Sequence, residues 1–567
     1  MSTKDNYDLQ GINLPRMSGL LLQLSTVLME KPATRWLIMP NLLNGAGLGH
    51  LRKLHLDDLP TFTPLHSHSA DDIATNEKDA LDLEGWLSTQ EERSSPFTTI
   101  QDYARAYRSG EQTPEKVAQS VLSAITESDR QNPPLRAFIA CLEEDVLAQA
   151  KASTRRFEAG TPLSVLDGVP IAIKDEFDQI PYPTTVGTRC LSRSPASKDA
   201  TAVARLRAAG ALLIGKTNMH ELGLGTTGLN PNHGTVRNPC DPGRHSGGSS
   251  SGSTAAVAAG LTPAALGADG GGSIRTPAAF CGVIGLKPTY GRVSEVGAFP
   301  ITPSMGHIGP IAATTVDAAL IYAIIAGVDP KDENTAVQPQ VSLPELEQKK
   351  LSDLSLGIYQ PWFNHAAPEV VRVCQSLLEH FEGLGIEIKE VHIPELEAMR
   401  LAHMVTIAAE AAAAVEPYYA RHCQDFSLEV RANLAMAYSL TAQDYLKSQQ
   451  IRTRAIQHFR QALAGVDAIV TPVSGIPAPA IRDDALESGE ADMHALAEML
   501  RFNTPANLTG LPAISFPAGY DTDGLPVGMQ AIAAPWREDV LLQLAYLSES
   551  LVHRQKPRLH FDILSAS

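Results

Sequence analysis

The sequence has few cysteines, and none of them is placed for a metal site or a disulfide framework. Its six cysteines are scattered through 567 residues and contain no Cys-x-x-Cys pair. A structural zinc site or a disulfide-stapled fold is therefore not expected. A reducing compartment, the cytoplasm, is the simplest location for such a chain.

Excess basic charge and long hydrophobic runs are also absent. The chain has 46 Lys and Arg against 63 Asp and Glu, a formal net charge of -17. A nucleic-acid partner is not expected, because phosphate backbones attract basic surfaces. No uninterrupted apolar run reaches the ~18 residues of a bilayer-spanning helix.

The sequence does contain enough hydrophobic residues, 44% of the chain, to form a large core. From about residue 99, patterns typical of helices and of strands alternate along the chain. Strands are predicted at 135–142, 168–177, 211–215 and 466–472, and a helix at 143–160. Such alternation predicts a layered α/β domain whose sheet lies between helices. A long helical stretch from about 395 to 465 interrupts the alternation.

Residues 14–43 form a separate feature, because apolar residues recur there at helical spacing on both sides of Lys31-Pro32. One interpretation is two helices packing on their own domain or on a second subunit. The other is a substrate gate or an interfacial membrane contact, in which Leu21 and Leu24 would line a hydrophobic entrance. We therefore divide the chain into a helical extension and linker (1–98), a main domain (99–560) and a short tail (561–567).

Two glycine-rich stretches are candidates for chemistry. The first, "GRHSGGSSSGSTAAVAAG" at 243–260, runs into apolar sequence, so we expect a loop that opens onto a buried helix over 254–267. The second, "GADGGGSIRTPAAF" at 267–280, leaves backbone N–H groups free to face a developing negative charge, as in an oxyanion hole. Neither stretch has the pattern of a P-loop, a dinucleotide site or a G-x-S-x-G nucleophile elbow.

A serine in such a loop needs a base to become nucleophilic. The histidines offer no obvious triad partner, whereas Lys174 ends the apolar run Val169–Ile173. Burial there would penalise the charged ammonium, so Lys174 could act as a neutral base.

At this point the motifs resemble a family. "LDGVPIAIKDEFD", "GKTNMHELGLGTTG", "HSGGSSSGSTAAVAAG" and "GADGGGSIRTPAAFCGVIGLKPTYGRVS" occur in the order found in amidase signature enzymes. The resemblance implies that family's fold, a mixed β-sheet covered by helices on both faces, and a Ser-cis-Ser-Lys triad. It assigns Ser273 as nucleophile, Ser249 as the bridging serine after a cis peptide, and Lys174 as base.

The same resemblance places the oxyanion hole at the backbone N–H groups of Gly270, Gly271, Gly272 and Ser273, and it implies no metal or organic cofactor. Asp269 and Arg275 are expected to brace the loops as a hydrogen-bonded pair.

Within the family, the chain is most similar to plant fatty acid amide hydrolases, from "LPRMSGLLLQLSTVLMEKP" to "MLRFNTPANLTG". This implies hydrolysis of lipophilic N-acyl amides such as N-acylethanolamines, a homodimer, and peripheral membrane contact through residues 14–43. A glutaminase subunit of a tRNA-dependent amidotransferase and a short-chain or aryl amidase are the alternatives.

Overall fold

The computed structural model describes residues 7–12, 14–66, 81–91, 95–346 and 353–565. Within them, eleven strands form one mixed sheet in the order β2-β4-β3-β5-β7-β6-β12-β13-β10-β8-β9. The strands of this sheet are β2 (Phe138–Ala140), β3 (Pro170–Lys174), β4 (Leu212–Thr217), β5 (Ala264–Ala268), β6 (Ile284–Lys287), β7 (Ile308–Ala312), β8 (Ser355–Ile358), β9 (Glu387–Glu390), β10 (Ala468–Pro472), β12 (Ala513–Tyr520) and β13 (Pro526–Ala533).

The helices are α1 (Gly19–Glu30), α2 (Pro32–Gly45), α3 (Leu48–Lys53), α4 (Leu83–Ser88), α5 (Ile100–Ser109), α6 (Pro114–Ser128), α7 (Glu143–Glu158), α8 (Thr201–Ala208), α9 (Ser251–Ala258), α10 (Arg275–Cys281), α11 (Thr315–Ile325), α12 (Gln360–Phe363), α13 (Pro368–Gly383), α14 (Leu396–His422), α15 (Leu428–Ala437), α16 (Ala442–Ala462), α17 (Met493–Leu500), α18 (Thr504–Thr509) and α19 (Glu538–Leu551).

Helices cover the sheet in two layers, as predicted. Helices α9 and α10 contact each other and the middle strands, while α8, α11, α19 and α13 form a second series of contacting helices. Strands β3, β4, β5 and β10 are buried along their whole length, which is why they read as continuous apolar runs rather than as alternating ones. The α/β fold class is therefore confirmed.

One predicted helix is shorter than expected. The apolar stretch 254–267 divides into the end of α9, a turn, and the buried strand β5. At the turn, Gly260 has φ +72°, and a Cβ there would lie 2.4 Å from the backbone oxygen of Phe561. The helix ends because the chain needs a glycine conformation and the C-terminal segment docks directly against it.

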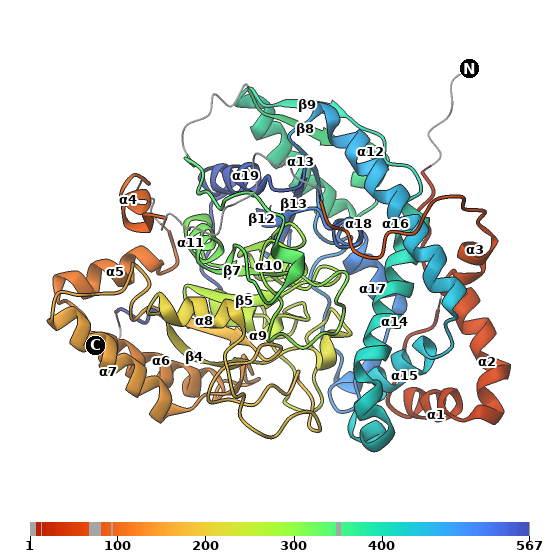
Figure 1. The fold of residues 1–567 in the computed structure, drawn as a ribbon, viewed down its shortest axis with the longest axis horizontal. Helices are drawn as coiled ribbons and strands as arrows, with labels where there is room; N and C mark the ends of the chain where they lie inside the picture. Colours follow the sequence, from red (N-terminus) through yellow and green to blue (C-terminus); the bar gives the residue numbers. More distant parts are fainter. Residues whose placement is uncertain (1–6, 13, 67–80, 92–94, 347–352, 566–567) are drawn as a thin grey trace.

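The predicted helical stretch 395–465 is present as α14, α15 and α16, and the N-terminal pair is present as α1 and α2. Figure 1 shows α1, α2 and α3 on the same side of the molecule as α14, α15 and α16. Helix α1 contacts α15, and a short strand β1 (Met17–Ser18) pairs with β11 (Glu490–Ala491). The extension is thus attached to the helical half of the main domain.

Helix α14 extends into a segment, Leu396–Asp425, that is long and apolar enough to cross a membrane by length and composition, although the sequence showed no unbroken apolar run. Just over half of its apolar window is buried within the molecule. It packs on α15, α16 and α18, as a core helix does.

Candidate active site

The candidate residues meet where parallel strands end. Lys174 is the last residue of β3, and β5 ends at Ala268, directly before the loop 269–274 that leads into α10. Strands β3 and β5 are parallel neighbours, so their carboxyl ends share one edge of the sheet. This edge is where open α/β sheets commonly place their ligands.

Lys174 and Ser249 are in direct contact at this edge. The Lys174 Nζ lies 2.9 Å from the Ser249 Oγ and 3.3 Å from the backbone oxygen of Ala268. The peptide bond between Gly248 and Ser249 is cis, as the family resemblance implies. Both side chains are buried, so bulk water does not compete for this hydrogen bond.

Ser273 is held beside them by the backbone. The Ser250 N–H donates to the carbonyl of Ser273 at 3.2 Å, which ties the two glycine-rich loops together. Only 8% of Ser273 is exposed, and that part faces cavities rather than open surface. The structure therefore brings all three predicted side chains to one place.

The neighbouring serines have structural contacts. Ser250 and Ser253 donate from Oγ to the β5 backbone, at Ala268 and Leu266, each at 3.0 Å. These bonds fix the start of α9 against the sheet, which positions Ser249 at the end of the preceding loop.

The predicted oxyanion donors are not equivalent. Gly272 donates its N–H to Asp269 Oδ1 at 2.6 Å. In the part of the chain that the structure describes, the N–H groups of Gly270, Gly271 and Ser273 have no hydrogen-bond partner. Three of the four predicted amides are thus available to a ligand, and Gly272 instead supports the loop.

The expected pair of Asp269 and Arg275 is confirmed as a bidentate ion pair. The Arg275 Nε lies 3.0 Å from Asp269 Oδ2, and Nη2 lies 3.0 Å from Oδ1, with both side chains fully buried. Burial would raise the pKa of Asp269, but the Arg275 guanidinium outweighs it and holds that pKa well below the usual range. A permanent carboxylate therefore anchors the Gly272 and Ile274 N–H groups.

Sequence reasoning missed an acidic neighbour of the lysine. Glu176 Oε2 lies 2.8 Å from Lys174 Nζ. The Lys174 Nζ therefore contacts a carboxylate as well as the Ser249 hydroxyl. Glu176 lies in the turn directly after β3, so its position two residues beyond Lys174 is the only local signal that the sequence offered.

It also missed His403, which supports the glycine loop from α14. The His403 Nε2 and the Gly270 carbonyl oxygen are 2.8 Å apart. Burial lowers the pKa of His403 to about 4, so the ring is neutral at pH 7 and donates from Nε2. A Cβ on Gly271 would lie 2.8 Å from the His403 ring, so this approach requires glycine.

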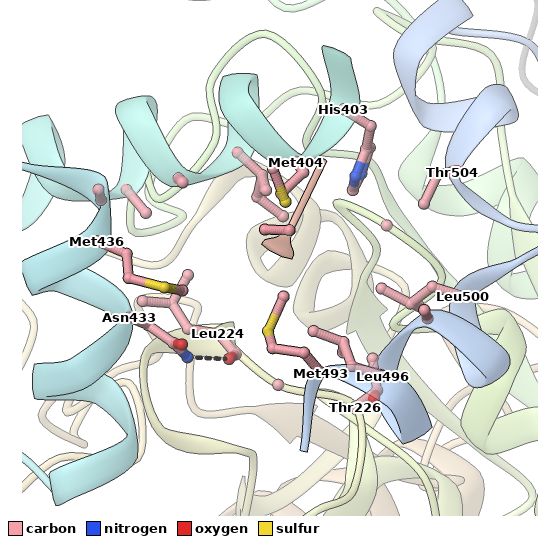
Figure 2. Close-up of a pocket in the computed structure, with 18 of the residues that line it drawn as sticks. Leu224, Thr226, His403, Met404, Asn433, Met436, Met493, Leu496, Leu500 and Thr504 are labelled. Carbon is pink, nitrogen blue, oxygen red and sulfur yellow. Dashed lines mark hydrogen bonds between the residues drawn. The ribbon is translucent and has the colours of Figure 1, made fainter. Parts of the chain in front are cut away.

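A large apolar cavity, here called the acyl-side cavity, opens beside Ser273. Its volume is about 1250 Å³ with the open mouth included. Figure 2 shows it surrounded by α14, α15 and α17, with Met404, Met436 and Met493 each from a different helix. Flexible methionines suit a site that accommodates apolar chains.

The N-terminal extension contributes to this cavity, but not through the predicted residues. Ile12, Leu43 and Ala46 line it. Leu21 and Leu24 do not line it and are 54% and 55% exposed at the surface. The expectation that these two leucines face the entrance is therefore wrong, because α1 turns its buried side towards α15 and leaves them outside.

Comparisons with known proteins agree with the motifs. Residues 119–542 match the family model described as Amidase. A fatty acid amide hydrolase of Medicago truncatula is 44% identical over 83% of this chain and 79% of its own length, and one of Arabidopsis thaliana is 38% identical over 99% and 97%. The structure of a peptide amidase from Stenotrophomonas maltophilia is 30% identical, with a TM-score of 0.71 over 82% of this chain and 99% of that one.

Proposed function

The chain belongs to the amidase family, and from this premise we propose that it is a serine hydrolase of long-chain N-acyl amides, N-acylethanolamines among them. The observation that carries the proposal is the acyl-side cavity, whose apolar walls end at Ser273. A buried methylene gains about 0.8 kcal/mol, so such walls favour a long acyl chain over the polar side chain of glutamine.

In the proposed reaction, Ser273 Oγ attacks the amide carbonyl while Ser249 takes its proton and passes its own to Lys174. The Lys174–Ser249 contact of 2.9 Å supports this relay. Glu176 Oε2, 2.8 Å from Lys174 Nζ, is placed to pair with the ammonium that this transfer creates.

The N–H groups of Gly270, Gly271 and Ser273 would stabilise the tetrahedral oxyanion. The relay then reverses to protonate the leaving nitrogen, the C–N bond breaks, and water releases the fatty acid from Ser273. No step calls for a metal or an organic cofactor.

The test is a parallel hydrolysis assay of a long-chain N-acylethanolamine, a short aryl amide and glutamine, with intact-protein mass spectrometry of the acyl-enzyme. The expected result is the highest kcat/KM for the long-chain amide and an adduct that Ser273→Ala lacks. If glutamine is the preferred substrate, the chain is instead the glutaminase subunit of an amidotransferase. An acyl adduct on the Ser273→Ala variant would refute the assignment of Ser273 as the nucleophile.

We further propose peripheral contact with a lipid surface through α1 and α2, in an otherwise cytoplasmic enzyme. Both helices expose apolar side chains, among them Leu20 on α1 and Trp36 on α2, each 69% exposed. Leu43, on the same helix as Trp36, lines the acyl-side cavity, so one helix joins the exposed surface to the substrate site. An exposed apolar patch of this kind is typical of an interaction surface.

Flotation with phosphatidylcholine vesicles tests this contact. Leu21→Ser with Leu24→Ser should weaken binding, whereas Leu59→Ser, a change at a residue 82% exposed but outside both helices, should not. Equal binding by all variants refutes the lipid contact. The mass of the protein in solution tests the predicted homodimer. If the wild type is a dimer and the Leu21→Ser, Leu24→Ser variant is a monomer, the exposed face of α1 contacts the second subunit instead of a lipid surface.

A further inference from the structure

A second cavity lies on the other side of Ser273. Its volume is about 600 Å³, and Lys174, Ser249 and Ser273 all line it. It shares Gly223, Ser273 and Ile407 with the acyl-side cavity, so the two spaces meet at the proposed nucleophile. A substrate whose carbonyl carbon sits at Ser273 can therefore extend in both directions. The larger apolar space suits the acyl chain, which leaves the second cavity, here called the amine-side cavity, for the amine part.

The amine-side cavity has an acidic wall. Glu176, Asp269 and Glu295 line it. Asp269 is neutralised by Arg275, and Glu176 is paired with Lys174. Glu295 differs, because its carboxylate has no ion-pair or hydrogen-bond partner among the residues that the structure describes.

Other negative groups surround Glu295. Burial, with the nearby carboxylates of Asp332, Glu176 and Glu410, raises the pKa of Glu295 well above its usual value. The carboxyl group of Glu295 lies against Gly306. Any side chain at position 306 would clash with it, because a Cβ on Gly306 would lie 2.5 Å from Glu295 Oε1. A cation brought into this space would relieve the repulsion and favour the ionised carboxylate.

His307 adds a second acceptor to the same wall. Its Nδ1 lies 2.7 Å from the carbonyl oxygen of Met305, while its Nε2 is buried and has no partner in the described chain. The residue is only 4% exposed and lines the amine-side cavity. Burial lowers the pKa of His307 well below its usual value, so the ring is neutral, with Nδ1–H donating and Nε2 free to accept. A buried acceptor without a partner is costly unless a ligand or water donates to it.

We propose that the amine-side cavity binds the amine part of the substrate and selects amides whose amine part ends in an ammonium group, that is, N-acylated diamines and polyamines. Glu295 supplies the counter-charge and His307 an additional acceptor. A hydroxyl-ended amine is the next best fit, because it can also donate to these groups. A carboxylate-ended amine is the poorest fit, because it would bring a further negative charge to the wall that contains Glu295. This inference rests on the proposed hydrolysis at Ser273.

The test is a series of three substrates with one long acyl chain and amine parts of nearly equal size: N-acyl-1,2-diaminoethane, N-acylethanolamine and N-acylglycine. Wild-type kcat/KM should fall in that order, with about a hundredfold between the ammonium and the carboxylate, as expected for charges that meet a single buried counter-charge. Glu295→Gln should compress this range by about tenfold, and Glu295→Asp should retain part of it. Glu379→Gln, an exposed change on α13, is the matched control and should leave the order intact.

Inhibition by free 1,2-diaminoethane tests the same cavity in the wild-type protein, so it does not depend on whether a variant folds. This diamine should inhibit competitively, whereas free glycine should not inhibit. Equal kcat/KM for the three substrates, or an unchanged range in Glu295→Gln, overturns the inference while leaving hydrolysis at Ser273 in place. If none of the three is hydrolysed but a short amide is, the proposed function itself fails.

Discussion

Replacing His403 by Phe tests whether α14 positions the oxyanion hole. The ring donates to the carbonyl oxygen of Gly270, and that oxygen shares a peptide unit with the N–H of Gly271. In a trans peptide the two groups point in opposite directions, so the bond to His403 also fixes where the Gly271 N–H points. Phe keeps a ring in the space and removes only the donor.

Two costs follow from the structure. The buried Gly270 carbonyl loses its partner, which costs about 1–3 kcal/mol of stability. If the peptide then tilts, the Gly271 donor is weakened. Complete loss of one oxyanion donor lowers kcat by about 10²–10³, so a weakened donor predicts a fall of about ten- to a hundredfold. The pKa of His403, about 4, makes the effect independent of pH above neutrality.

The assay separates this from a merely structural role. His403 also lines the acyl-side cavity, so Met404→Leu beside it serves as the control for altered chain binding. His403→Phe should lower kcat with little change in KM. His403→Phe should also weaken inhibition by a long-chain trifluoromethyl ketone, because that compound forms a tetrahedral adduct with the nucleophile. Inhibition by the corresponding fatty alcohol, which forms no adduct, should be unchanged. His403→Gln, which retains a donor, should recover part of the loss. A change confined to KM, or equal weakening of both inhibitors, refutes the positioning role.

Three further outcomes are expected. Lys174→Ala should lower kcat by on the order of 10³-fold or more, with a residual rate that rises with pH as hydroxide replaces the base; a wild-type pH profile in this variant would disprove the relay. Leu43→Ser should lower the ratio of kcat/KM for long over short amides by about tenfold, through lost contact with one or two methylenes, whereas Leu24→Ser should leave the ratio unchanged. Burial raises the pKa of Asp317 from its ordinary value of 3.8 to about 7, so ionisation penalises the folded state and the free energy of unfolding should fall as pH rises from about 4 to about 7. Asp317→Asn should flatten that dependence, whose size is on the order of 4 kcal/mol for a shift of about three pKa units; equal slopes in thermal melts of the two proteins would contradict the assignment.

The sequence predicted those parts of the site that depend on local pattern. Lys174 could be placed because a buried strand reads as an apolar run that ends at a charge, whereas Ser249 and Ser273 were assigned through the resemblance of their glycine-rich motifs to amidase signature enzymes. The division of 254–267 into helix and strand was not predictable in the same way. It depends on the docking of Phe561 against Gly260, residues far apart in the chain.

The supporting residues were missed for the same reason. His403 reaches Gly270 across 133 positions in the sequence, and Glu295 lines the same cavity as Ser273 from a loop with no motif of its own. Nothing in periodicity or composition brings such residues together. Leu21 and Leu24 were misassigned because an amphipathic pattern identifies a helix but not which neighbour covers each face.

Different parts of the chain supply the three proposed reacting groups and the walls of the acyl-side cavity. Lys174 is the last residue of β3, Ser249 lies in the loop before α9, and Ser273 lies in the loop between β5 and α10. The acyl-side cavity is built mainly from α14, α15 and α17 together with residues of the N-terminal extension, none of which belongs to the sheet. Substitutions in those helices can therefore change the chain length that is accepted while the distances among the three reacting groups stay the same. His403 is the exception, because it lines the acyl-side cavity and also holds the Gly270 carbonyl, so changes on α14 near this residue should affect substrate choice and turnover together.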